Sequence, residues 1–360
     1  MTKVYCIGCG LVTPVGNTPA EVLAAVRAGK TAFRQYEGWP EPYYTSLLDR
    51  SGFEGPSFFD HIVLQAAQAA VQEAGIDASS ARVGLVLSTI KANIDKIDSE
   101  DVSLAAAAET LAKSLGVTTA PVVVSNACIS GLAALLQGVR MIRSGEFDHV
   151  IVAGAEVQSR FIVTGFQSLK ALSLNPCKPF DADREGLNVG EASAAIVLSA
   201  HADRPSWEIV DGAVRNDANH ISGPSRTGEG SYNALRYVLE GVKADELAFV
   251  NVHGTATRYN DQMEAIALNR AGLQDVPVNA LKGIFGHTMG AAGILESIVS
   301  MQACDAGIVL PTQGFSRMGV EPAVNVSAQE RKTDKQAFVK LLSGFGGVNG
   351  ALLFRKGGAR

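Results

Sequence analysis

The chain lacks an excess of positive charge and lacks a long apolar run. Its 31 Lys and Arg residues are outnumbered by 36 Asp and Glu residues, which leaves a formal net charge of -5 and no overall basic field for nucleic acid. Gly, Pro, Ser or charged residues interrupt every hydrophobic segment before it could span a bilayer. Residues 1–16 have neither the basic start nor the long apolar stretch of a secretory signal. The sequence therefore predicts a cytoplasmic protein that binds neither nucleic acid nor membrane.

Cysteine is scarce, and the chain has no paired cysteine framework. The five residues, which fit a reducing compartment, are Cys6, Cys9, Cys128, Cys177 and Cys304. Cys6 and Cys9 form a C-x-x-C pair in a strand-like segment without a second ligand pair, which favours a structural role over a metal or redox role. No metal site is predicted. The glycine turn that follows also lacks the third glycine of a dinucleotide fingerprint, because Thr13 and Pro14 stand there.

The chain is rich in apolar residues, which make up 47% of its 360 positions and can form an extensive core. The most informative stretch is 122–143, V-V-V-S-N-A-C-I-S-G-L-A-A-L-L-Q-G-V-R-M-I-R. Its pattern predicts a short buried strand at 122–124 and a helix over 131–143, with Cys128 on the turn between them. A helix N-terminus favours a thiolate, and hence a nucleophile. On this stretch alone, a small buried cysteine remains an equal alternative.

The two halves of the chain repeat one plan. The strand, turn and helix around Cys128 correspond to a strand at 276–280, a polar turn and a helix at 291–306, and the closing strands of both halves follow glycines. This predicts an α/β fold of duplicated halves, 1–205 and 206–360, with two mixed sheets and helices between and outside them. The other expected elements are helices at 21–29, 61–74, 104–115, 233–242 and 261–269, strands at 83–88, 149–154, 192–199, 207–214 and 247–252, and a polar segment at 158–184.

Four polar turns follow predicted strands, where open α/β sheets place their ligand sites. One holds Cys128, the second holds His253 in N-V-H-G-T-A-T, the third holds Lys282 and His287 in L-K-G-I-F-G-H-T-M-G, and the last is the glycine-rich turn at 344–347. Each signal is weak alone, because a single histidine or glycine turn is common. Together they predict one site built from both halves.

Motifs along nearly the whole chain resemble those of the β-ketoacyl-[acyl carrier protein] synthases, decarboxylating condensing enzymes of the thiolase-like fold. They are T-P-V-G, N-A-C-I-S-G, P-F-D-A-D-R-E-G, D-A-N-H-I-S-G-P, H-G-T-A-T, L-K-G-I-F-G-H-T-M-G-A-A-G and G-F-G-G. The resemblance implies a layered α-β-α-β-α architecture. It also implies a condensation of malonyl-carrier protein with an acyl thioester in fatty acid, polyketide or polyene biosynthesis.

The resemblance assigns roles to individual residues. Cys128 would carry the acyl group, and His253 and His287 would donate hydrogen bonds to the malonyl thioester and stabilise its enolate. The backbone N–H groups of Cys128 and Phe345 would bind the oxyanion. Lys282 and Glu296 would form an ion pair beside the site.

Further implied residues act on the substrate arm and the loops. Thr255 and Thr257 would hydrogen-bond the phosphopantetheine arm, Gly344 and Gly346 would let the Phe345 loop move as a gate, and Asp261 would support the site. No cofactor is expected beyond the phosphopantetheine on the carrier protein. The expected partners are an acyl carrier protein and a second subunit, either an identical chain or another ketosynthase-like chain.

Residue differences separate the chain from related condensing enzymes. A thiolase would need a second cysteine near G-F-G-G, acyl-CoA-primed enzymes have Asn where His287 stands, and a chain length factor would lack Cys128. Three departures from the family pattern are Ala256, where Gly is commoner, Asn126, where Thr is commoner, and a short segment between residues 88 and 104. The short segment keeps open a partner-dependent or non-catalytic subunit. Candidate docking residues for the acidic carrier protein are Arg140, Arg143, Lys170, Lys178 and Arg226.

Overall fold

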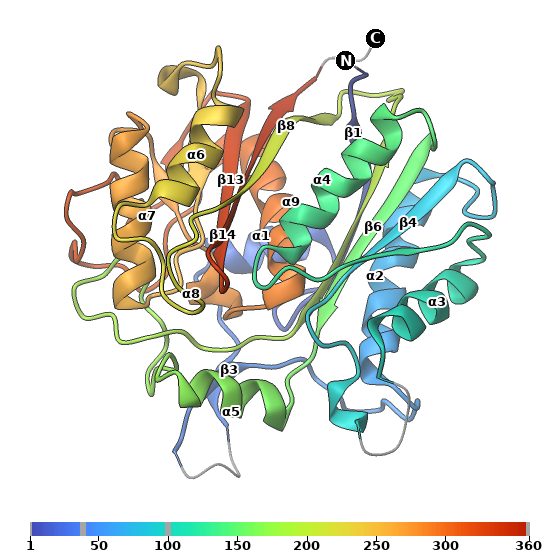
Figure 1. Cartoon of the computed structure of the whole chain (residues 1–360), viewed down its shortest axis with the longest axis horizontal. Helices are drawn as coiled ribbons and strands as arrows, with labels where there is room; N and C mark the ends of the chain where they lie inside the picture. The colour runs from blue at the N-terminus through green and yellow to red at the C-terminus, as the bar shows by residue number, and fades with distance from the viewer. Residues whose placement is uncertain (1, 37–40, 98–101, 358–360) are drawn as a thin grey trace.

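The computed structural model describes residues 2–36, 41–97 and 102–357, and its largest feature is a ten-stranded sheet (Figure 1). The N-terminal half contributes five neighbouring strands in the order β1-β7-β6-β4-β5. Their bounds are β1 (Tyr5–Val12), β7 (Ala192–Ser199), β6 (His149–Glu156), β4 (Val83–Ser88) and β5 (Val122–Val124). The first three strands pair antiparallel, and β6, β4 and β5 run parallel.

The C-terminal half repeats this order and these directions strand by strand, as β8-β14-β13-β9-β10. Its strands are β8 (Trp207–Asn216), β14 (Val348–Lys356), β13 (Ala337–Gly344), β9 (Phe249–Asn251) and β10 (Val278–Asn279). The pairs β8/β14 and β14/β13 are antiparallel, whereas β13/β9 and β9/β10 are parallel. The predicted duplication is therefore confirmed, while the boundary between residues 205 and 206 stays a prediction.

The expectation of two separate sheets is wrong in one respect. The first strands of the two halves, β1 and β8, meet edge to edge through the pairs Tyr5↔Glu208 and Cys6↔Trp207, which joins the halves into one sheet. This seam covers backbone groups that two open sheet edges would leave without partners.

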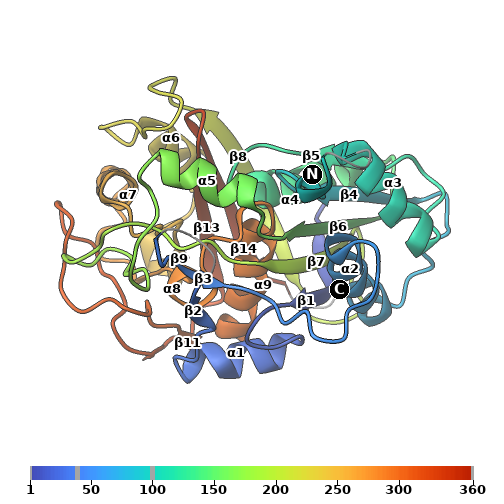
Figure 2. The same ribbon diagram turned by 90° about the horizontal axis from the view of Figure 1, so that it is seen from below.

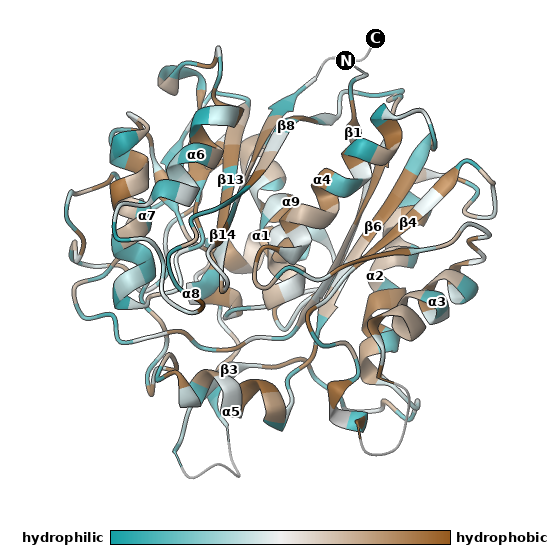
Figure 3. Ribbon diagram, viewed as in Figure 1, coloured by the Kyte–Doolittle hydropathy of each residue, from teal (hydrophilic) through white to brown (hydrophobic). Residues whose placement is uncertain are grey.

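Three of the four apolar clusters in the described residues divide the molecule into five layers. One cluster lies between the two half-sheets around α4 (Ser130–Arg143) and α9 (Ala292–Asp305), and the others lie outside them. Strand β13 shows the division, because Phe338 and Leu342 belong to the central cluster and Val339 and Leu341 to an outer one. Helices α2 (Phe58–Ala74) and α3 (Leu104–Leu115) cover one outer face, and α6 (Glu229–Val238) and α7 (Arg258–Arg270) the other (Figures 1 and 2). Apolar colour follows the sheet strands (Figure 3).

The two central helices touch backbone to backbone at their N-terminal turns. A Cβ placed on Gly293 of α9 would lie 2.2 Å from the backbone nitrogen of Leu132 in α4, so only glycine permits this approach. Because Cys128 lies two residues before α4 and His287 lies two residues before the turn η3 (Met289–Ala291) that leads into α9, the contact brings these two side chains together.

Some elements differ from the sequence predictions. The polar segment 158–184 contains a helix, α5 (Arg160–Ser168), which Ser159 caps by accepting a hydrogen bond from the backbone N–H of Ile162. Helices α6 and α7 begin three to four residues earlier than predicted. Part of the short segment between 88 and 104 lies outside the described residues.

The remaining elements are α1 (Pro19–Arg27), α8 (Lys282–Phe285), β2 (Phe33–Gln35), β3 (Tyr44–Ser46), β11 (Ile308–Val309), β12 (Arg331–Lys332), η1 (Ile94–Lys96) and η2 (Ala244–Glu246). Within the described residues, no helix combines the length and apolarity needed to cross a bilayer.

Candidate active site

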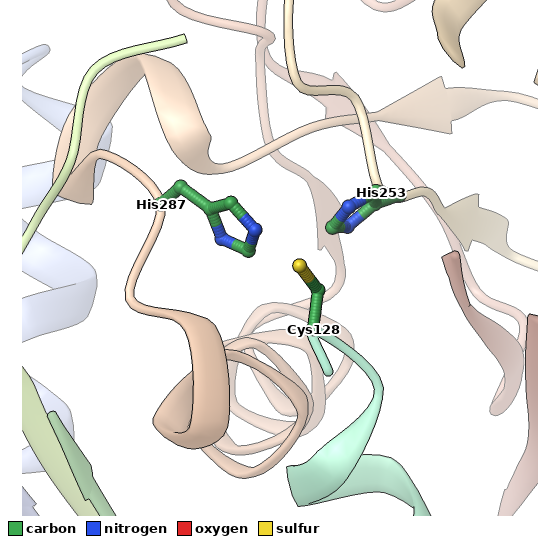
Figure 4. Close-up of side chains that lie close together, drawn as sticks. All are labelled: Cys128, His253 and His287. Carbon is green, nitrogen blue, oxygen red and sulfur yellow. The ribbon is translucent and has the colours of Figure 1, made fainter. Parts of the chain in front are cut away.

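Cys128, His253 and His287 converge from three separate turns, as predicted. One donor atom from each lies within 4.8 Å of the other two, and the three side chains point toward one another (Figure 4). All three are buried and line a pocket of about 740 Å³ that opens to the surface. Within the described residues, no other group of His, Cys, Asp and Glu side chains is placed to hold a metal ion.

The turn that carries Cys128 is held by a neighbouring serine. Ala127 adopts a left-handed backbone with φ +47°, which turns the chain sharply between β5 and α4. The Ser130 hydroxyl accepts a hydrogen bond from the backbone N–H of Asn126 at 2.8 Å and donates one to the carbonyl of Ala127 at 2.6 Å. These bonds fix a strained turn that presents the sulfur to the pocket.

Burial decides the charge state of the Cys128 thiol, which is only 6% exposed. Burial raises the pKa of Cys128 to about 11, although Lys282 and the backbone N–H groups of Phe345 and of Cys128 itself act in the opposite direction. The expectation that the helix N-terminus favours the thiolate gives the direction of one contribution to this pKa, and burial outweighs that contribution. The N–H groups predicted to bind an oxyanion nevertheless act on the sulfur, and Cys128 rests as a neutral thiol.

His287 is held in one tautomer by the backbone. Its Nδ1 accepts a hydrogen bond from the N–H of Met289 at 3.3 Å, so the proton of the neutral ring resides on Nε2. That Nε2 is buried and has no partner among the described residues. Burial, followed by the charges of Lys282 and Lys340, lowers the pKa of His287 well below its usual value. The ring is therefore a neutral donor with an unused N–H group.

His253 is positioned by a buried carboxylate that the sequence analysis did not select. Glu264 accepts hydrogen bonds from the backbone N–H groups of His253 and Gly254, both at 2.7 Å, and so fixes the loop after β9. Burial, then Lys282, lowers the pKa of His253 well below its usual value. Its ring lies 5.1 Å from that of His287, at 80°. Two neutral imidazoles thus stand beside one thiol.

The predicted ion pair of Lys282 and Glu296 exists, and a second lysine joins it. Lys282 Nζ lies 2.8 Å from Glu296 Oε1, and Lys340 Nζ lies 2.6 Å from Oε2 of the same carboxylate. Burial acts to raise the pKa of Glu296, but the two ammonium groups outweigh it and lower that pKa. This buried triad carries a net positive charge next to both histidines, and it does not line the pocket.

The residues predicted to bind the pantetheine arm lie at the pocket wall. Thr255 and Thr257 both line it, with their hydroxyl oxygens 2.9 Å apart. Ala256 between them has φ +61°, a left-handed conformation that glycine adopts without strain, which explains the commoner glycine at this position. Asp261 accepts a hydrogen bond from the backbone N–H of Phe180 at 2.8 Å, and it does not line the pocket. Its supporting role in the site stays a prediction.

The glycine-rich turn forms another wall of the pocket. Gly344 and Phe345 line it, whereas Gly346 does not. The Phe345 ring is 38% exposed and lies 5.9 Å from the ring of Phe166, a pocket residue on the unpredicted helix α5. A Cβ on Gly347 would lie 2.5 Å from Asp217 Oδ1, so a side chain at this position would displace the turn.

The candidate docking residues are scattered. Lys170 lines the main pocket and Lys178 a separate small one, and Arg226 is exposed. Arg140 and Arg143 lie in the last turn of α4, at the opposite end from Cys128, about 18 Å and about 22 Å away by the rise of a helix. Arg258, which was not predicted, lines the pocket mouth. Of the predicted set, only Lys170 lies on the route to Cys128.

Comparison with known protein families and with individual proteins identifies the family to which the chain is similar. The model of the β-ketoacyl synthase N-terminal domain matches residues 51–204, and that of the C-terminal domain matches residues 207–316. The chain is 26% identical to 3-oxoacyl-[acyl-carrier-protein] synthase 2 of Vibrio cholerae over 412 residues, covering 98% of this chain and 99% of that protein.

Two solved structures are also similar. One is a β-ketoacyl synthase from Burkholderia phymatum, with 26% identity, a TM-score of 0.88 and coverage of 99% of this chain and all of that one. The other is a ketosynthase from Xenorhabdus doucetiae in complex with its chain length factor, with 25% identity, a TM-score of 0.87 and coverage of 99% and 98%. With both domain models matched in order and the thiolase-like layers and duplicated sheet in place, the chain belongs to the β-ketoacyl synthase family of condensing acyltransferases.

Proposed function

We propose that this chain condenses an acyl group, held as a thioester on Cys128, with malonyl-carrier protein, and releases a 3-oxoacyl-carrier protein and carbon dioxide. The observation that supports this most directly is the meeting of one thiol, two neutral imidazoles and the Phe345 N–H group in one open pocket. The name of the Vibrio relative supports the carrier protein as the substrate carrier.

The first step transfers the acyl group. The Cys128 sulfur attacks the acyl thioester carbonyl, and the oxyanion binds the N–H groups of Cys128 and Phe345. The bond to the pantetheine sulfur breaks, and the proton of the Cys128 thiol leaves with that sulfur as a free thiol. Because the Cys128 thiol is neutral at rest, this proton needs no external acid.

The second step uses the histidines. With malonyl-carrier protein bound, His253 and His287 donate hydrogen bonds to the thioester oxygen, and loss of carbon dioxide leaves an enolate on that oxygen and the neighbouring carbon. The buried net positive charge of the triad stabilises the enolate. The enolate carbon attacks the acyl-Cys128 carbonyl, the carbon–sulfur bond breaks, and the released thiolate takes up a proton.

The same proposal includes the surroundings of the reaction. No bound cofactor or metal is needed, because the substrates bring their own thioesters and the imidazoles supply the hydrogen bonds. All five cysteines are free, which supports action in the reducing cytoplasm. The chain works as a dimer, either with itself or with a ketosynthase-like subunit, as in the Xenorhabdus complex.

A second candidate is a subunit that depends on such a partner for its activity. It is favoured by the short segment before residue 104 and by the likeness to a ketosynthase bound to a chain length factor. Size-exclusion chromatography with light scattering separates an active homodimer from a chain that stays monomeric until a partner is added.

The experiment that tests the main proposal is intact-mass analysis after incubation with a panel of acyl-carrier proteins. An acyl adduct is expected on the wild type and on Cys9→Ala, a control at the partly exposed cysteine, and none on Cys128→Ala. An adduct that persists in Cys128→Ala, or no adduct from any donor on a folded chain, would contradict the proposal.

A further inference from the structure

Lys340 is a fully buried lysine in the middle of the C-terminal half-sheet, and no role in the reaction follows from the family resemblance. It lies on β13, paired with Asn251 of β9 on one side and with Leu352 of β14 on the other. Its side chain shares a face of β13 with Phe338 and Leu342, so it enters the central apolar layer. A charge in this place is costly unless its surroundings compensate it.

Oxygen atoms surround the ammonium group. Lys340 Nζ lies 2.6 Å from Glu296 Oε2 and 3.1 Å from the carbonyl oxygen of Leu341. It lies 3.4 Å from the carbonyl of Val252 and 3.5 Å from that of Asn251. Three N–H groups thus face one carboxylate and three carbonyls, which satisfies the donors completely.

Each partner of Lys340 is close in sequence, or linked by an ion pair, to a residue of the site. Val252 is the residue before His253, and Leu341 stands on the strand that runs directly into the turn of Phe345. Glu296 connects Lys340 to Lys282, which begins the short helix α8 before His287. One ammonium group therefore ties together the three segments that carry both histidines and the gate.

The charge of Lys340 also acts on the histidines directly. It contributes to the lowered pKa of both His253 and His287, after burial and Lys282. The other charged groups near this cluster are Glu264, behind the His253 loop, and Glu296. Without Lys340, the Lys282–Glu296 pair would remain, but the pair is neutral, so the net positive charge of the triad would be lost.

We propose that Lys340 is a positioning residue for decarboxylation and condensation, whose ammonium group holds the His253, His287 and Phe345 segments in their relative places without touching substrate. The proposal rests on the proposed function, because it assigns the histidines to the malonyl step. It predicts that loss of Lys340 slows decarboxylation of malonyl-carrier protein strongly. The rate at which a small reagent alkylates Cys128 should change little.

The test compares Lys340→Met with the wild type and with Lys356→Met, a lysine on the neighbouring strand that pairs with Asp305 at 2.8 Å near the surface. Methionine is unbranched and apolar, is one heavy atom shorter than lysine, and leaves the Lys282–Glu296 pair intact. For malonyl-carrier protein decarboxylation, kcat should fall at least tenfold in Lys340→Met while KM stays within threefold. Alkylation of Cys128 by iodoacetamide should stay within twofold, and Lys356→Met should match the wild type in all three. Lys340→Gln, which can still donate hydrogen bonds to the carbonyls, serves as a second variant if the first does not fold.

Three results would overturn the proposal. They are an unchanged kcat, a loss carried by KM alone, and parallel losses of decarboxylation and alkylation with a lowered melting temperature, which indicate a structural role. If the wild type itself does not decarboxylate malonyl-carrier protein, the proposed function fails instead. Hydrogen exchange then still tests Lys340, because faster exchange at amides 253–257 and 282–288 in the variant supports positioning and unchanged exchange refutes it.

Discussion

Glu156 provides the sharpest test of the electrostatics, because it is a buried carboxylate that forms no ion pair within the part of the chain that the structure describes. It ends β6 and is fully buried, and its Oε1 accepts hydrogen bonds from the backbone N–H of Ile90 and, at 3.1 Å, from the Thr89 hydroxyl. Its Oε2 has no partner among the described residues. Burial raises the pKa of Glu156 from 4.5 to about 7. We predict that Glu156→Gln stabilises the protein at high pH.

The sign follows from proton binding. Between pH 4.5 and 7 the folded protein binds a proton at Glu156 that the unfolded chain has lost, so wild-type stability falls as the pH rises through this interval. Glutamine does not ionise and avoids this loss. A difference of 2.5 pKa units between the folded and unfolded states corresponds to about 3 kcal/mol. The variant should therefore be more stable by about 3 kcal/mol at pH 8 and by less than about 1 kcal/mol at pH 5.

The assay is denaturant unfolding at pH 5 and pH 8, with the midpoint and the slope measured for each variant. Glu146→Gln, at an exposed glutamate, is the matched control and should show no such difference. The negative charge of Glu156 also raises the pKa of Cys128, so the variant should react faster with iodoacetamide at pH 8. A Glu156→Gln stability gain that is equal at both pH values, or a loss at pH 8, would refute the reasoning.

Three further predictions concern backbone and hydrogen-bond geometry. Ala256→Gly relieves a left-handed alanine and should change stability by at most about 1 kcal/mol, upward, in a melting experiment; a lowered melting temperature contradicts it. Burial acts to raise the pKa of Asp181, but hydrogen bonds from three backbone N–H groups outweigh it and lower that pKa to about 2, so this carboxylate adds stability above pH 4 that is lost as the pH falls through 2. Asp181→Asn should therefore cost about 2 kcal/mol at pH 7 in denaturant unfolding, with the gap closing below pH 4. Gly347→Ala should slow condensation at least tenfold in a product assay because its Cβ meets Asp217, whereas Gly52→Ala, with a similar φ but open space around it, should not.

The sequence was informative wherever a local pattern decided the structure. The alternation of strands and small-residue helix starts predicted the duplication, because the same order of strand, turn and helix occurs in each half of the sequence. The seam between β1 and β8 was not predictable, since it depends on how two edges meet and leaves no local signal at Tyr5 or Glu208. Helix α5 was missed although Ser159 is a capping residue, because polar residues dominate its exposed side.

The residues of the candidate site also fall into those with a local sequence signal and those that only the tertiary fold reveals. Cys128, His253 and His287 were recognisable because they stand in turns after strands. Lys340 was not, because a lysine within a strand is typical of an exposed position, and only the tertiary fold supplies its oxygen partners. The net pKa of Cys128 was not predictable from the sequence for a related reason. A helix N-terminus is a local feature, whereas the burial that outweighs it is supplied by residues far along the chain.

That origin of the burial bears on how the protein is made. Most of the groups that line the pocket around Cys128 come from the C-terminal half, so they are synthesised after it. A nascent chain that ends before β13 exposes the cysteine to any electrophile, whereas in the finished protein reagents reach it only through the pocket. The rate at which Cys128 is modified during synthesis therefore measures how far the two halves have assembled.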